Sequence, residues 1–190
     1  MWDHKLPSTA ARRRRLNKII WFIWGCSAAL IFASGCGATV SSTAPLNQLK
    51  WCSSPVVVFI NDASAPPQKL ATWKEAQAAL GFRPLLPAQL PANLCLVSAD
   101  AIAHDPAQGS HFSLTYAGSN FQALSIAETP ALQIIAQPNC SAGVSQNITI
   151  ATCQLTISHI TITVTGMESI QYLRGLFTQL QPNINWEPAH

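Results

Sequence analysis

Charged residues are scarce in this chain. Only 10% of its 190 residues are Asp, Glu, Lys or Arg, against about 25% in an ordinary soluble domain. This low fraction argues against an acidic disordered tail and against a coiled coil. No basic stripe follows residue 35, so we predict no nucleic-acid partner. The length suits one domain with its own core.

Recognised catalytic and metal-binding patterns are missing as well. After residue 35 there is no G-x-S-x-G, no H-E-x-x-H and no Gly-rich phosphate loop. No two cysteines are spaced as C-x-x-C, which argues against a zinc module. We therefore predict no enzyme activity, no metal and no cofactor. The alternative is an extracytoplasmic hydrolase with a His/carboxylate site, for which His104, Asp105 and His111 flank one expected hairpin loop.

What is present begins with a basic and then apolar N-terminal segment. Residues 1–35 hold six Lys and Arg against one Asp, a net charge of +5. An uncharged apolar run of 14 residues, Ile19 to Phe32, follows Lys18. Cationic residues stay on the cytoplasmic side while an apolar helix enters the bilayer. The pattern predicts an export signal, and it does not decide between the general and the twin-arginine routes.

The end of the apolar run, Ala33-Ser34-Gly35-Cys36, resembles the lipobox of bacterial lipoproteins. We predict a signal peptide over residues 1–35, an acylated (palmitate-bearing) Cys36 with a flexible tether over 36–50, and an extracytoplasmic domain over 51–190. Membrane lipid, reached through Cys36, is then the first partner, and the protein is lipid-anchored on the outer side of the cell membrane. The alternative is an uncleaved single-pass anchor, although the run is short for a span of about 20 residues.

Four further cysteines lie in the expected domain: Cys52, Cys95, Cys140 and Cys153. In an oxidising compartment four cysteines favour two disulfides, for which three connectivities exist. We favour Cys140 with Cys153, since only 12 residues separate them, which leaves Cys52 with Cys95.

Local patterns predict the elements of the domain. A β-branched run, Val56 to Ile60, is typical of a strand, and the capping-box spacing of Thr72 and Glu75 with Gly81 predicts a helix over 73–80. The proline-rich stretch 82–91 reads as an extended edge connector or lid. Apolar alternation after Leu94 predicts successive antiparallel strands. We also expect a strand over 132–136 and a polar loop over 139–146.

The C-terminal third carries the most specific pattern. A two-residue turn at Ser158-His159 would pair Ile157 with Ile160, Leu155 with Ile162, and Cys153 with Val164, all on one face. Ile148 and Ile150 have the opposite parity, which predicts a bulge or break near Thr152. Apolar residues at helical spacing predict an amphipathic helix over about 167–180 that covers the sheet.

Together these elements predict an α+β fold: an antiparallel sheet packed by a long C-terminal amphipathic helix and a short N-terminal helix. From Trp73 onward the chain resembles the bacterial family called domain of unknown function 4367. The residues that carry the resemblance are Glu75-Ala76, Phe82, Pro87 and Leu90-Pro91. The resemblance implies a membrane-anchored protein without established activity. Some members look similar to periplasmic lipoprotein carriers and sigma-factor regulators, in which sheet and helix enclose an apolar cavity.

The expected function is therefore that of a non-catalytic binding, sensing or envelope-associated module. An apolar ligand beneath the closing helix, or an envelope protein, is the expected partner. The large residues that could line such a pocket are Trp51, Trp73, Phe82, Tyr116, Tyr172, Phe177 and Trp186.

Overall fold

The computed structural model describes residues 42–64, 66–119, 122–145 and 147–189. Within them 49% of residues lie in strands and 14% are helical, in two α-helices and short 3-10 segments. The prediction of an α+β fold with a long C-terminal helix was wrong, because the domain is a β-rich fold. The expected signal peptide and Cys36 lie outside the described residues.

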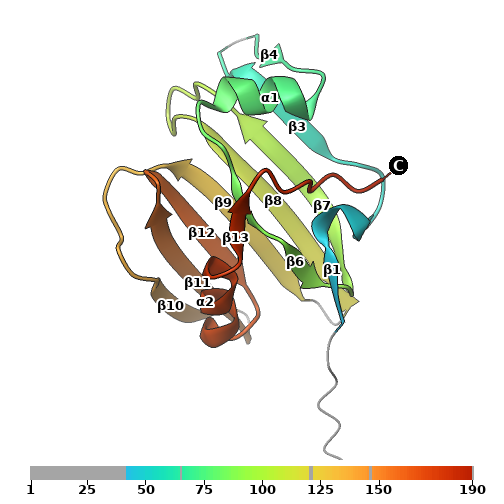
Figure 1. Ribbon diagram of the computed structural model, residues 1–190, viewed down its shortest axis with the longest axis vertical. Helices are drawn as coiled ribbons and strands as arrows, with labels where there is room; N and C mark the ends of the chain where they lie inside the picture. The colour runs from blue at the N-terminus through green and yellow to red at the C-terminus, as the bar shows by residue number, and fades with distance from the viewer. Residues whose placement is uncertain (1–41, 65, 120–121, 146, 190) are drawn as a thin grey trace, which may run out of the picture. The chain divides into compact units, whose positions relative to one another are not determined.

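One large sheet forms the body of the domain (Figure 1). Its strands run in the order β10 (Asn139–Ser145), β11 (Ile148–Ile157), β12 (Ile160–Gly166), β9 (Ala123–Pro130), β8 (His111–Gly118), β7 (Leu94–Ile102), β3 (Val57–Asp62) and β4 (Gln68–Lys69). These neighbours are antiparallel except β3, which runs parallel to β7, as does the short strand β2 (Lys50–Trp51). The predicted antiparallel succession from Leu94 is confirmed for β7, β8 and β9.

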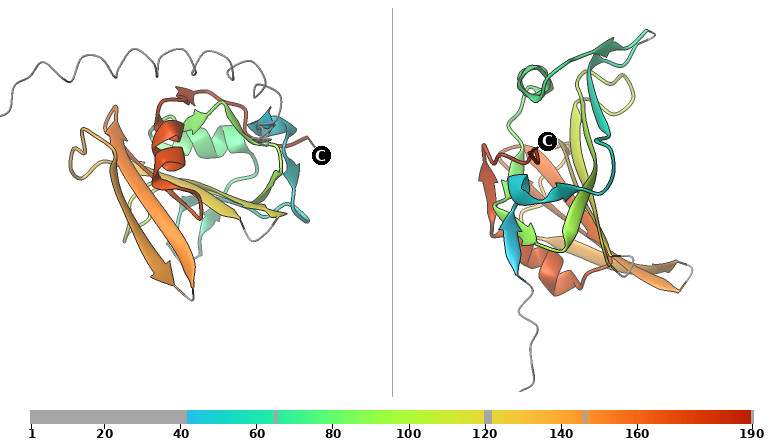
Figure 2. Two further views of the ribbon diagram at one scale, coloured as in Figure 1. Left: turned by 90° about the horizontal axis from the view of Figure 1, so that it is seen from below. Right: turned by 90° about the vertical axis from the view of Figure 1, so that its right-hand side faces the viewer.

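Alternation of side chains gives the sheet one buried and one polar face. Phe112, Leu114 and Tyr116 of β8 are buried, as are the residues paired with them on β9. On the other face of β11 and β12 the hydroxyls of Thr152 and Thr165 lie 3.1 Å apart. Figure 2 shows the sheet bent, with both helices on its concave side. The core therefore lies inside the curve.

The predicted hairpin is confirmed residue by residue. Cys153 pairs with Val164, Leu155 with Ile162, and Ile157 with Ile160. Ser158 and His159 both have positive φ, as a two-residue type I′ turn requires. The bulge or break expected near Thr152 is absent from the described strand. Strand β11 pairs in unbroken register with β10 from residue 148 to 154 and with β12 from residue 151 to 157.

Two predictions for the segment before this hairpin were wrong. Residues 132–136, expected as a strand, form an irregular loop, while the expected polar loop 139–146 contains strand β10. Small and polar side chains suit an edge strand that neighbours only β11, and the Cys140–Cys153 pair lies in its register. A lone apolar stretch does not become a strand where it has no buried face to fill, and Leu132 is fully exposed.

The two helices are of equal length. Helix α1 (Trp73–Leu80) matches its prediction, with the capping box of Thr72 and Glu75 formed and Gly81 left-handed at φ 76°. Helix α2 spans only Ile170–Phe177. At its end the Thr178 hydroxyl donates to the Gly175 carbonyl at 2.7 Å. Leu180, expected as the last helical contact, instead lies in strand β13 (Leu180–Pro182), which pairs with β5 (Leu85–Pro87).

Residues expected to form a tether belong to the fold. Strand β1 (Thr43–Pro45) pairs with β6 (Gln89–Pro91), and the 3-10 helix η2 (Leu46–Gln48) follows it. Leu46 and Leu49 are buried in the core. The ordered domain therefore includes residues from Thr43 on, rather than from Trp51, and the proline-rich stretch supplies β5 and β6.

Candidate functional site

Four aromatic rings meet where α1 crosses the sheet. Trp73, the first residue of α1, lies 5.0 Å from Phe112 and 5.4 Å from Trp186 between ring centroids, and Phe59 of β3 lies 5.9 Å from Trp73. The indole rings of Trp73 and Trp186 meet edge to face, an arrangement that aromatic pairs favour. The cluster anchors α1 and the C-terminal segment to β3 and β8.

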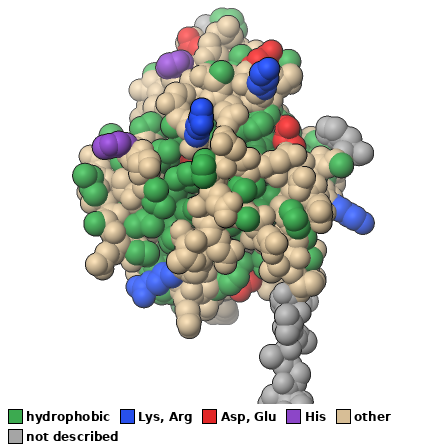
Figure 3. Space-filling model, viewed as in Figure 1, with side chains coloured by type: hydrophobic (Ala, Val, Ile, Leu, Met, Phe, Trp, Pro, Cys, Tyr) green, Lys and Arg blue, Asp and Glu red, His purple; other side chains and the backbone are tan. Residues whose placement is uncertain are grey.

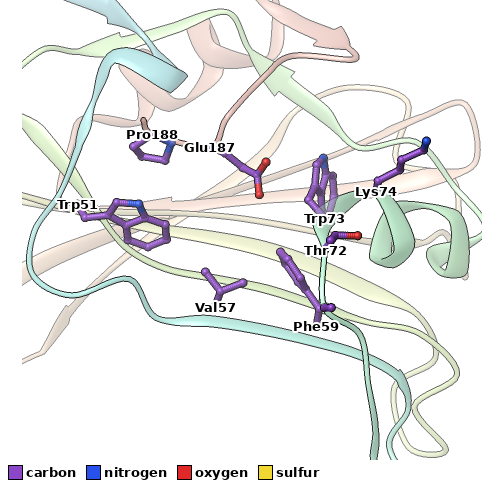
Figure 4. Close-up of a pocket in the computed structure, with 9 residues that line it drawn as sticks. Trp51, Val57, Phe59, Thr72, Trp73, Lys74, Glu187 and Pro188 are labelled. Atoms are coloured by element: carbon purple, nitrogen blue, oxygen red, sulfur yellow. The ribbon is translucent and has the colours of Figure 1, made fainter. Parts of the chain in front are cut away.

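A cleft of about 460 Å³ opens beside this cluster. Trp51 forms one wall, Phe59 and Trp73 form the opposite side, and Val57 lies along the floor (Figure 4). The remaining lining residues are Ala71, Thr72, Lys74, Glu187 and Pro188. Pockets of roughly 300 Å³ and above accommodate small molecules, and most are lined by apolar and aromatic side chains with few polar groups. The arrangement suits a small ligand with a flat apolar face.

Two charged residues line this cleft, Lys74 and Glu187. In Figure 4 the Glu187 carboxylate points into the space between Trp51 and Trp73, while Lys74 extends away along α1. The capping box fills the start of α1: the Glu75 carboxylate accepts the Ala71 amide at 2.9 Å and the Thr72 amide at 3.3 Å, and the Thr72 hydroxyl accepts the Glu75 amide at 3.3 Å. The N-terminus of α1 is therefore occupied by a carboxylate of the chain itself.

A disulfide holds the Trp51 wall in place. Cys52 is bonded to Cys95 of β7, and Lys50 and Trp51 pair in parallel with Cys95 and Leu96. The second disulfide joins Cys140 to Cys153 across β10 and β11. Both favoured pairings are thus present in the structure.

The structure separates the aromatic residues that the sequence grouped as candidates. Trp51 and Trp73 line the cleft, whereas Tyr116 and Trp186 are buried at 1% exposure. The expected site beneath the closing helix is filled, since Leu173 and Leu176 of α2 are buried in the core. Phe59 was missed because it lies within a β-branched run that also fits a plain core strand.

The histidine region lies in the β7–β8 connection. The Asp105 carboxylate accepts the amides of Ala107 and Gln108 at 2.7 and 2.9 Å, and these bonds lower its pKa. His111 places Nδ1 3.4 Å from the Gly109 carbonyl, and His104 has positive φ. Among the described residues no group of three or more His, Cys, Asp or Glu side chains could hold a metal ion. Asp105 therefore acts as a turn-forming residue.

Among the residues that the structure describes, one carboxyl group is fully buried, that of Glu128 on β9. The Leu85 amide donates to both of its oxygens, each at 3.0 Å, and so ties β5 to the concave face of the sheet. Burial raises the pKa of Glu128 to about 8, against the smaller opposite effect of the Leu85 hydrogen bond. Glu128 does not line the aromatic cleft. No sequence pattern singles it out, because it occupies an ordinary inward position of the strand.

Comparisons with known proteins identify no family for the chain. No family model matches it, and no curated protein matches it. A solved structure, the complex of Pseudomonas aeruginosa MucA and MucB, aligns with a TM-score of 0.39 and 14% identity. The alignment covers 64% of this chain and 38% of that chain, so this chain spans well under half of it. The described residues contain no helix that is both long and apolar enough to cross a membrane.

Proposed function

We propose that this protein is a membrane-anchored, extracytoplasmic binding module whose ligand enters the aromatic cleft. The observation that carries the proposal is the set of three aromatic side chains, Trp51, Phe59 and Trp73, around a space of about 460 Å³. Burying a flat apolar ligand against such walls gains roughly 25 cal/mol for each Å² removed from water. The ligand class is a small molecule with an apolar or aromatic face, and the Glu187 carboxylate contacts its polar end.

Anchoring is part of the same proposal. The charge pattern of residues 1–35 and the Ala33-Ser34-Gly35-Cys36 sequence support export followed by acylation of Cys36. More than one acyl chain is needed for stable anchoring, and lipoprotein maturation supplies it. Cys36→Ser should abolish metabolic labelling with palmitate and leave an unprocessed precursor. Unchanged labelling in this variant would refute the lipobox assignment.

Ligand binding can be tested with a neutral hydrophobic fluorophore, N-phenyl-1-naphthylamine, added to the full chain in a non-denaturing detergent. Val57→Arg places a long charged side chain in the cleft at a position already 41% exposed. Val58→Arg is its matched control, since Val58 is 36% exposed on the same strand and does not line this cleft. We expect saturable binding above the detergent background that Val57→Arg removes and Val58→Arg retains.

Two results would contradict the proposal that the ligand binds in the aromatic cleft. The first is an equal loss of binding in both variants. The second is binding by the Val57→Arg protein as tight as that of the unmodified chain. A Trp51→Ala variant adds a check from the opposite wall, because it widens the cleft and should weaken binding without adding charge.

A further inference from the structure

The hairpin of β10 and β11 projects past the rest of the sheet. Strand β12 pairs with β11 only from Ala151 to Ile157, whereas β10 continues to pair with β11 down to Ile148. Residues 143–145 and 148–150 therefore form a two-stranded ribbon with no third strand beside it. At about 3.3 Å per residue, the ribbon extends about 10 Å beyond the end of β12.

This ribbon exposes apolar side chains on both of its faces. Val144 is 74% exposed, and Ile148 and Ile150 are each 39% exposed. Val144 has the parity of Cys140 and Cys153 on the buried side of the sheet, while Ile148 and Ile150 have the parity of Thr152 on the polar side. The expected bulge would have turned these two isoleucines inward, and the unbroken register leaves them outside instead.

Charge is missing from the same segment. From Asn139 to Gly166 the sequence contains no Lys, Arg, Asp or Glu, and on the face seen in Figure 3 charged side chains are few and scattered. Edge strands of proteins in water are commonly guarded by charged side chains, above all lysine. An uncharged edge ribbon with protruding Val and Ile instead suits contact with an apolar medium.

The chain enters the domain at the same end of the sheet. Ser42 accepts the amide of Ala92, in the turn between β6 and β7. Strand pairing connects that turn to the ribbon across the sheet. Leu94, the first residue of β7, pairs with Gly118 at the end of β8. Leu124 of β9 pairs with Gly166 of β12, and Gly166 pairs with Ala151, the residue next to the ribbon. Ser42, the β6–β7 and β8–β9 turns and the hairpin tip thus share one end, while the 131–138 loop and the Ser158-His159 turn lie at the other (Figure 1).

Covalent continuity then limits how far this end can be from an anchor at Cys36. Five residues lie between Cys36 and Ser42, and the six Cα-to-Cα steps that join them span at most about 20 Å when the chain is fully extended. An acylated Cys36 would hold Ser42, and the β6–β7 turn that it contacts, within that distance of the bilayer. The apolar ribbon projects from the same end.

We propose that the β10–β11 tip, through Val144, Ile148 and Ile150, inserts into the interfacial layer of the phospholipid bilayer in which the acylated Cys36 is anchored. This inference rests on the anchoring proposed above and adds a second, protein-mediated contact. The tip would fix the orientation of the domain, with the sheet upright on the membrane.

The test uses the full chain reconstituted in vesicles of phosphatidylethanolamine and phosphatidylglycerol. A dansyl-bearing amino acid replaces Ile148 in one sample and Ile134 in another. Ile134 is a matched control, because it is an apolar residue, 80% exposed, near the opposite end of β11. That end lies about 30 Å away along a ten-residue strand. Quenching by lipids brominated in their acyl chains reports depth, and vesicle flotation reports anchoring.

We expect both labelled proteins to float with the vesicles and the label at position 148 to be quenched several-fold more than that at 134. Adding Val144→Asp and Ile150→Asp should reduce quenching at 148 while flotation persists. Flotation with equal or no quenching at the two positions overturns the ribbon contact but leaves the anchor standing. Failure to float overturns the anchor and this inference together. Cross-linking of ribbons from two copies, without quenching, would assign the surface to a dimer and overturn the proposal.

Discussion

Replacing the buried Glu128 by glutamine should remove a specific part of the pH dependence of folding. Glu128 is fully buried between its partners Phe112 on β8 and Ile162 on β12, and both of its oxygens receive the Leu85 amide. Glu128→Gln keeps an oxygen to accept that amide and nearly the same volume. It removes the group that titrates, so the two proteins should differ chiefly in how their stability responds to pH.

The sign follows from the raised pKa of Glu128, about 8 in the folded chain against an ordinary 4.5. Below the ordinary value both states hold the proton, and the folded state has its full stability. As the pH rises, the unfolded chain releases the proton while the folded chain keeps it, so the free energy of unfolding falls by about 1.4 kcal/mol per pH unit. The decline ends near pH 8, where the folded state ionises too.

Between about pH 5.5 and about pH 7.5 the unmodified chain should therefore lose about 2 to 3 kcal/mol relative to Glu128→Gln. Urea unfolding of both proteins at several pH values, followed by tryptophan fluorescence with the disulfides intact, measures this difference. All other titratable groups are the same in the two proteins, so their contributions cancel in the comparison. Parallel stability curves for the two proteins would refute the argument that burial holds the proton on Glu128.

Two further predictions concern the frame of the fold. Removing the disulfides one at a time should lower the free energy of unfolding in urea by about 4 kcal/mol for Cys52→Ser with Cys95→Ser and by about 3 kcal/mol for Cys140→Ser with Cys153→Ser. The first disulfide joins residues 43 apart and the second joins residues 13 apart, so the first restricts the unfolded chain more. A larger loss from the shorter loop would contradict the chain-entropy reasoning. Gly166→Ala should destabilise by about 1 to 3 kcal/mol, because its Cβ would lie 2.9 Å from the Ala123 carbonyl, whereas Gly143→Ala meets nothing within 4 Å and should leave the thermal midpoint nearly unchanged.

Several local features could be predicted from the sequence because their causes lie within about ten residues. The capping box of Thr72 and Glu75 with Gly81 defined helix α1 at both ends. The alternation around Ser158-His159 determined the β11–β12 register, because a one-residue slip would move every inward side chain to the other face. The short spacing of 12 residues favoured the Cys140–Cys153 disulfide, and Cys52–Cys95, which closes a much longer loop, followed only as the remaining pair.

Only the tertiary structure decided the features that depend on distant partners. Helical spacing continued to Leu180, yet α2 ends at Phe177 because residues 180–182 pair with β5, almost a hundred residues earlier. Residues 139–145 form a strand because they pair with the free edge of β11. The more apolar residues 132–136 form no strand, because the fold has no buried face for their side chains to cover. The cleft brings Trp51, Phe59, Trp73 and Glu187 together from four separate segments. The periodicity of the sequence indicates which face of an element is apolar, whereas strand pairing and packing with distant segments determine what covers that face.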